Sequence, residues 1–155
     1  MRRSHQKTVG MLGVLLALSV TLSESVYSAD EAFDTLVNAR SLKCVFDVAA
    51  TGRWKEGKLS VETGRDDLTL NFDSIDLKAQ KARMIGNQAA DDVVVLTSKR
   101  GITFLEETPI GNFTFTTVFF RYNAAKDFIA VTSRHMDFIL GMTISQLHGS
   151  CQIYQ

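Results

Sequence analysis

Apolar and polar side chains alternate along most of this chain, which is typical of β-strands with one buried face. The exception runs from Asp30 to Arg40, where Phe33, Leu36 and Val37 share one helical face and Asp30 is a suitable cap. We therefore expect one short helix followed by strands. The expected strands are Leu42 to Ala50, Lys58 to Thr63, Leu68 to Leu77, Ala82 to Asn87, Asp92 to Ser98, Ile102 to Glu107, Asn112 to Arg121, Asp127 to His135, and Thr143 to Tyr154.

Turn-forming residues separate these segments and predict an antiparallel meander of eight to nine strands. The clearest turns are Gly64-Arg65-Asp66-Asp67, Lys99-Arg100-Gly101 and Pro109-Ile110-Gly111. Within Leu68 to Leu77 the apolar phase changes, which predicts a β-bulge near Asp73 or Ser74.

The cysteines Cys44 and Cys151 are the only two in the chain and lie near the two ends of the strand region. Each follows the apolar phase of its own segment, so both side chains are expected to point inward. An oxidising compartment makes such a pair a disulfide, although two free buried thiols are the alternative. The first and last strands should then be neighbours, which favours a closed barrel over a sandwich, with the helix outside or plugging one end.

Residues 1–29 predict the compartment, because they have the three zones of a secretory signal peptide. Basic residues come first, an apolar run extends from Val9 to Leu22, and small residues follow up to Ser28 and Ala29. The apolar run is shorter than the roughly 20 residues of a spanning helix. We expect a periplasmic or secreted single domain over residues 30–155, with no stable membrane insertion after cleavage.

Removing residues 1–28 changes the charge balance only slightly. It takes away three of the 17 basic and one of the 17 acidic residues, leaving 14 and 16 and a net charge of −2. Without a basic stripe, nucleic acid is not an expected partner.

Two resemblances are visible in the sequence. Gly52-Arg53-Trp54 resembles the Gly-x-Trp motif that opens lipocalin barrels, and this implies a lipocalin-like or calycin-like barrel with the tryptophan closing one end. From about Ile85 onward the chain is similar to small exported bacterial β-rich proteins of unassigned function. That similarity rests on Ile85-Gly86-Asn87, Glu106-Glu107-Thr108-Pro109, Gly111-Asn112, Thr116-Thr117-Val118, Ser133-Arg134-His135 and Gly149-Ser150-Cys151. It implies export and a β-rich domain, and it implies no activity.

No convincing catalytic constellation is present, so we do not expect an enzyme. In Ser133-Arg134-His135, strand geometry places Arg134 on the opposite face from its neighbours, and no Gly-x-Ser-x-Gly motif accompanies the serine. Three or four metal ligands are not suggested by any spacing, so no metal or cofactor is expected. If Ile102 and Phe104 face inward, Glu106 ends that apolar row and could orient a ligand, pair with Arg121 or Arg134, or be solvated.

Two functions are consistent with these features. The first is a barrel that carries a small apolar ligand, for which an eight-stranded interior is wide enough. The alternative is a rigid β scaffold whose loops, Thr51 to Gly57 and Tyr122 to Lys126, bind or inhibit another periplasmic protein. The candidate binding residues are Trp54, Glu106, Arg121, Arg134 and His135. The mixed apolar segment from Met136 to Met142 is expected to be core, with a flap or a partner-binding patch as alternatives.

Overall fold

The computed structural model describes residues 23–86, 90–138 and 141–154, with side chains from Ala29 onward except that of Phe138. One helix, α1 (Ser23–Val37), precedes eight strands. The strands are β1 (Leu42–Lys55), β2 (Lys58–Asp76), β3 (Lys81–Ile85), β4 (Ala90–Thr97), β5 (Gly101–Glu107), β6 (Phe113–Tyr122), β7 (Phe128–Phe138) and β8 (Gly141–Ile153). Of the expected signal peptide, residues 1–22 lie outside the described residues, and Ser23 to Ala29 lie in α1.

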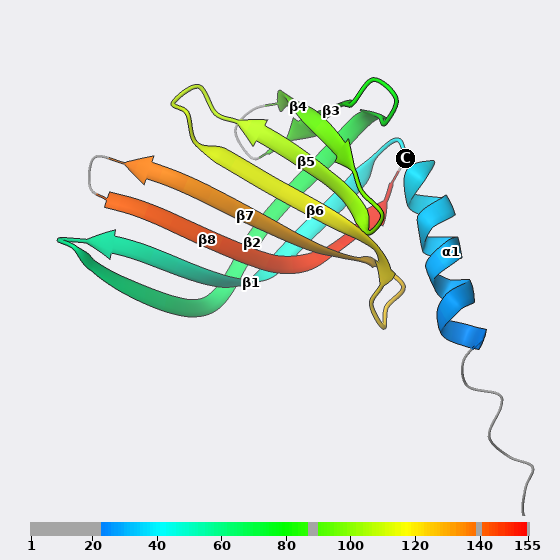
Figure 1. Cartoon of the computed structure of the whole chain (residues 1–155), viewed down its shortest axis with the longest axis horizontal. Coiled ribbons are helices and arrows are strands. Elements are labelled where there is room, and N and C mark those ends of the chain that lie inside the picture. Colours follow the sequence, from blue (N-terminus) through cyan, green and yellow to red (C-terminus); the bar gives the residue numbers. More distant parts are fainter. Residues whose placement is uncertain (1–22, 87–89, 139–140, 155) are drawn as a thin grey trace, which may run out of the picture.

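Each strand pairs antiparallel with the next, and β1 also pairs antiparallel with β8. The eight strands therefore make a continuous ring of backbone hydrogen bonds, with α1 at one end (Figure 1). We call the half that contains α1 the helix end. The opposite half, where the β1–β2 and β7–β8 hairpins extend, is the hairpin end (Figure 1).

The expected turn at Gly64 to Asp67 is wrong, because β2 runs without interruption through it. Gly64 pairs with Ala49 and Arg65 with Val48, after which the register resumes at Phe46 and Leu68. Asp66 and Asp67 thus lie opposite the single residue Asp47 as a bulge. Pairing with the long partner β1 outweighs the local turn preference, and two expected strands become one.

The expected bulge near Asp73 or Ser74 is confirmed. Ser74 has a φ of 53°, and the β2–β3 register shifts between Asp73 and Asp76. At the same place, the Ile75 N–H donates to the carbonyl oxygen of Arg40 at 3.1 Å, and the Arg40 Nη1 donates back to the Ile75 carbonyl at 2.8 Å. The bend therefore attaches β2 to the segment that follows the helix.

Helix α1 ends at Val37 rather than at the expected Arg40. The Asn38 side-chain amide donates to the Asp34 carbonyl at 2.7 Å, and the Ala39 N–H donates to the Leu36 carbonyl at 3.2 Å, which closes the last turn. Ala32 and Leu36 are fully buried. The helix thus covers the helix end of the ring with its apolar side.

The core lies inside the ring at the helix end. Three phenylalanines, Phe46, Phe72 and Phe104, are fully buried or nearly so, and the Phe72 and Phe104 rings stack with centroids 4.0 Å apart. These large rings supply much of the apolar area that stabilises the domain.

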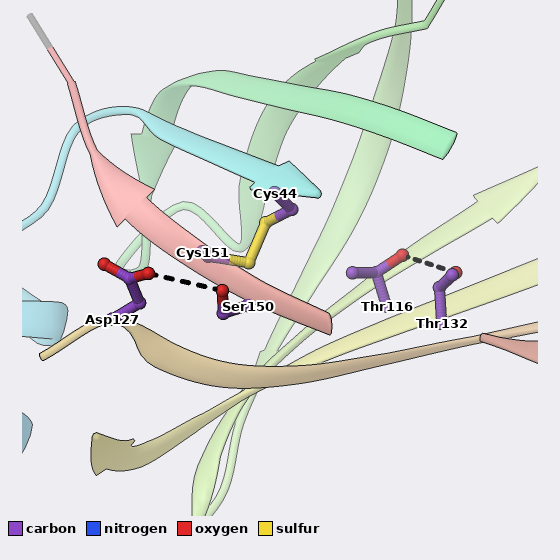
Figure 2. The surroundings of a disulfide bond; sticks show 6 residues. All are labelled: Cys44, Thr116, Asp127, Thr132, Ser150 and Cys151. Atoms are coloured by element: carbon purple, nitrogen blue, oxygen red, sulfur yellow. Dashed lines mark hydrogen bonds between the residues drawn. A yellow bond between two sulfur atoms is a disulfide. The ribbon is translucent and has the colours of Figure 1, made fainter. Parts of the chain in front are cut away.

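The expected disulfide is confirmed. Cys44 on β1 and Cys151 on β8 are directly opposite each other, with Cα atoms 4.0 Å apart, and both are fully buried (Figure 2). The bond joins residues 107 positions apart in sequence, so it covalently closes the seam between the first and last strands.

Candidate functional site

The β1–β2 hairpin carries Trp54 as part of a regular strand, so the expectation of a loop from Thr51 to Gly57 is wrong. Only Glu56 and Gly57 form the turn, with φ angles of 52° and 74°. Two consecutive positive φ angles are the signature of a two-residue type I′ turn, which glycine accommodates at its second position. The tight turn lets both strands continue to Lys55 and Lys58 and holds Trp54 directly opposite Leu59.

Large apolar side chains gather on the outer face of the hairpin end. Trp54 pairs with Leu59, and Gly52 lies between Val61 on β2 and Ile144 on β8. Together with Met142 these side chains form what we call the Trp54 face. Their exposed fractions are 44% for Trp54, 53% for Leu59, 66% for Val61, 40% for Met142 and 41% for Ile144. Neighbouring exposed apolar side chains of this kind are a common feature of interaction surfaces.

Polar residues border the Trp54 face on two sides, toward β7 and toward the helix end. His135 on β7 pairs with Ile144, while the next row toward the helix end contains Thr63 and Gln146 on either side of Ala50. An apolar centre with a polar rim is the usual composition of a protein–protein interface. Met142 is exposed, so it does not lie in the core that was expected for the segment from Met136 to Met142, while Ile139 and Leu140 lie outside the described residues.

The inner face of the hairpin end is polar instead. On β1 and β2 it carries Arg53, whose Nη1 donates to Glu62 Oε2 at 3.0 Å. On the opposite wall, Thr114 lies between Glu106 and Arg134 in one cross-strand row, and Ser145 continues the row beyond Arg134. Thr114 and Ser145 are buried, whereas Glu106 and Arg134 are half-buried. The row can therefore offer hydroxyl, carboxylate and guanidinium groups to the interior.

A second row of hydroxyls lies one step deeper. Thr116 Oγ1 donates to Thr132 Oγ1 at 2.9 Å, and both residues are fully or almost fully buried (Figure 2). This row also contains Phe104 and Leu147. It marks the boundary between the apolar interior of the helix end and the polar interior of the hairpin end.

Glu106 on β5 and Arg134 on β7 lie on either side of Thr114 on β6. Their backbones are therefore two strand spacings apart, or roughly 9.5 Å. Within the described part of the chain, the ion pairs are Arg53–Glu62 and Arg83–Asp73. Glu106 belongs to neither of these ion pairs, so its pairing with an arginine stays a prediction.

Ser133 and His135 lie on the outer face, as the alternation of β7 indicates. The Ser133 hydroxyl accepts a hydrogen bond from Gln146 Nε2 at 3.5 Å, and the His135 ring packs against Phe115 with centroids 5.4 Å apart. Because His135 pairs with Ile144, it lies beside the Trp54 face.

Arg121 lies near the end of β6 at the helix end, beside α1 and far from the other four candidates. The nearby segment Tyr122 to Lys126 is a turn in which Asn123 Oδ1 accepts backbone hydrogen bonds from Ala125 and Asp127. Neither feature contributes to the Trp54 face.

Perturbed carboxyl groups occur on β2, away from these rows. Arg83 donates two hydrogen bonds to Asp73, at 2.9 and 2.6 Å, and thereby holds the pKa of that carboxyl below its usual range. The pKa of Asp76 is also lowered, first by a hydrogen bond from the Ala79 N–H. Both carboxylates support the turn and bulge around them.

Sequence reasoning missed Leu59, Val61, Met142 and Ile144 as members of the surface. A signal was present, since Leu59 and Val61 alternate with polar residues just after Gly57. Alternation shows which residues share a face and does not show which face is buried.

No cluster of three or more His, Cys, Asp or Glu side chains suited to a metal ion occurs in the described residues. Over the same residues, no helix is both long and apolar enough to cross a membrane. No family model, curated protein or solved structure matches this chain.

Proposed function

We propose that this chain is an exported binding protein, a rigid β scaffold that docks another protein on the Trp54 face. The observation that carries the proposal is the set of five exposed, large apolar side chains on adjacent, hydrogen-bonded strands. A partner with a complementary apolar surface would remove these side chains from water. Tryptophan is among the residues most often found at the energetic centre of such interfaces.

The scaffold suits this role because the strands already fix the surface. Trp54 and Leu59 are held opposite each other by a two-residue turn, so docking orders few additional backbone torsions. A preorganised surface loses less conformational entropy on binding than a mobile loop does.

The second candidate is a closed, lipocalin-like barrel that carries a small apolar ligand. The ring of strand pairings supports closure of such a barrel. Against an apolar interior site, Phe46, Phe72 and Phe104 occupy the apolar half, and hydroxyls and charges line the other half. These observations favour the outer face as the binding surface.

Export to the periplasm or to the medium is part of the proposal. The Cys44–Cys151 bond supports it, since disulfides persist in oxidising compartments and are rare in the cytosol. The signal-like composition of residues 1–29 is consistent with the same compartment.

Affinity capture from periplasmic or culture extract with the immobilised protein tests the proposal. We expect a reproducible protein partner whose affinity falls by about thirtyfold with Trp54→Ala, as for a residue at the centre of an interface. Val61→Thr should weaken capture, and its matched control Val94→Thr, on the outer face of β4, should not. If the partner is captured equally well by the Trp54→Ala variant, it binds another surface and the proposal is wrong. If lipid is extracted from the protein and no protein partner is captured, the small-ligand carrier is favoured.

A further inference from the structure

A groove of about 800 Å³ lies at the helix end, between α1, the β4–β5 turn, β6 and β7. Its volume is in the range of sites for small organic ligands. Four large apolar side chains line it together with Ala29, namely Phe33, Phe119, Phe120 and Ile129. Three cationic side chains, Lys99, Arg100 and Arg121, share this lining with one carboxylate, Asp30. The groove therefore combines an aromatic floor with a net charge of +2.

Backbone contacts hold the cationic wall against the aromatic floor. The Ser98 hydroxyl accepts hydrogen bonds from the N–H groups of Arg100 and Gly101, at 3.1 and 3.2 Å, which fixes the turn. The Phe120 N–H donates to the Arg100 carbonyl at 2.9 Å. Gly101 makes this approach possible, because a Cβ there would collide with the Val118 carbonyl oxygen.

The aromatic floor is built from two elements that also contact each other. Phe33 on α1 meets Phe120 on β6 edge to face, with ring centroids 4.9 Å apart. Phe33 nevertheless remains 45% exposed, so an apolar ligand can still cover it. The floor offers burial of apolar area, which is the main favourable term for a small apolar group.

Among the described residues that line the groove, one carboxylate, Asp30, accompanies these three cations. Over the residues that the structure describes, the ion pairs are Arg53–Glu62 and Arg83–Asp73, and both lie away from the groove. Arginine is well suited to bind carboxylate, sulfonate and phosphate groups through paired N–H donors. The charge of the groove thus complements an anion beside an apolar body.

We propose that this groove binds a small amphipathic anion: an acyl chain or aromatic body covers Phe33, Phe119 and Phe120 while its anionic head faces Arg100, Lys99 and Arg121. The head group is a carboxylate, sulfonate or phosphate. The site lies at the end of the molecule opposite the Trp54 face (Figure 1), so it does not depend on the function proposed above.

Calorimetric titration with two amphiphiles of equal chain length tests the charge requirement. Dodecanoate and dodecyltrimethylammonium are each added, below their critical micelle concentrations, to the full chain prepared without detergent. We expect dodecanoate to bind at least tenfold more tightly than the cation, and added salt to reduce this preference by screening the exposed charges. Equal affinity for the two, or no binding of dodecanoate, would overturn the proposal.

Paired substitutions then locate the site. Arg100→Gln with Arg121→Gln should weaken dodecanoate binding about tenfold or more, whereas Arg100→Lys with Arg121→Lys should retain most of it. Lys58→Gln with Arg65→Gln is the matched control, since it removes the same charge from exposed positions on β2. Circular dichroism checks that each variant is folded. An equal loss in the control pair would contradict the assignment.

Trp54→Ala separates the two proposals. It should leave dodecanoate binding unchanged, because Trp54 lies at the hairpin end. If this variant abolished dodecanoate binding, the amphiphile would be using the Trp54 face and the groove assignment would be wrong, while the protein-docking proposal would stand.

Discussion

The helix end and the hairpin end use the same alternating strands with opposite distributions of apolar side chains. At the helix end the inward residues are apolar, and α1 and the disulfide close the structure around them. At the hairpin end the inward row carries Thr114, Arg134 and Ser145, while Trp54 and Val61 are exposed outside. The first end buries its apolar area in a core, and the second leaves apolar area exposed to solvent.

The change between the two ends depends on strand irregularities as well as on sequence. Asp47 has no counterpart on β8, where Phe46 pairs with Gly149 and Val48 with His148, so the phase of β1 shifts there and Phe46 and Ala49, rather than Phe46 and Val48, point inward. Beyond that point Val48 and Trp54 share the outer face. A single inserted position thus decides that Trp54 is displayed rather than buried.

Truncating one large aromatic residue at each end gives the largest expected contrast. Phe72→Ala should lower the free energy of unfolding by about 3–5 kcal/mol, since it leaves a cavity beside Phe104. Trp54→Ala should change it by less than about 0.5 kcal/mol, because the side chain is exposed. Urea unfolding followed by circular dichroism measures both. Comparable losses would mean that the hairpin end contributes a core of its own.

Local pattern was sufficient to predict much of the helix end. The inward phases of Cys44 and Cys151 predicted the disulfide, and the phase change near Ser74 predicted the bulge there. Both depend on side-chain direction within a few neighbouring residues, which a sequence displays directly.

The hairpin end was less predictable because long-range pairing decides it. Turn-forming residues occur in two segments that were expected to be loops, Gly64 to Asp67 and Thr51 to Gly57. Nevertheless β2 and β1 pair with neighbouring strands through these segments and remain extended. Arg121 and Arg134 each lie in the second half of their strands, β6 and β7. Because these neighbouring strands run antiparallel, the two residues lie at opposite ends of the ring. Assigning either to a site required the register.

Removing the disulfide tests how the helix end is closed. Replacing Cys44 and Cys151 together by alanine should lower the free energy of unfolding by about 2–4 kcal/mol, because the unfolded chain regains the freedom of a long loop. Urea unfolding measures the loss, and intact mass with thiol alkylation verifies the bond in the parent protein. A parent protein with two freely alkylated thiols would contradict the disulfide described for this end.

The boundary between the two interiors can be tested at Thr116 and Thr132. Thr132→Val should cost about 1–3 kcal/mol, because the buried Thr116 hydroxyl loses its acceptor, whereas Thr116→Val with Thr132→Val should be nearly neutral. A double-mutant cycle in urea measures the coupling. Additive losses would indicate that these hydroxyls do not depend on each other and that the boundary is already hydrated.

The smallest expected effect concerns the ion pair of Asp73 with Arg83, outside the core of either end. The hydrogen bonds from Arg83 lower the pKa of Asp73 in the folded protein, so this contact stabilises the fold above the unfolded pKa of about 4. The contribution is lost as the pH falls through the lower, folded pKa. Thermal unfolding between about pH 6 and pH 2 should therefore show a smaller decline in Asp73→Asn than in the parent protein, with Asp91→Asn, an exposed carboxylate on β4, as the control. An unchanged decline in Asp73→Asn would show that this ion pair contributes no acid sensitivity, and the acid sensitivity of the molecule would then have to arise from other carboxylates.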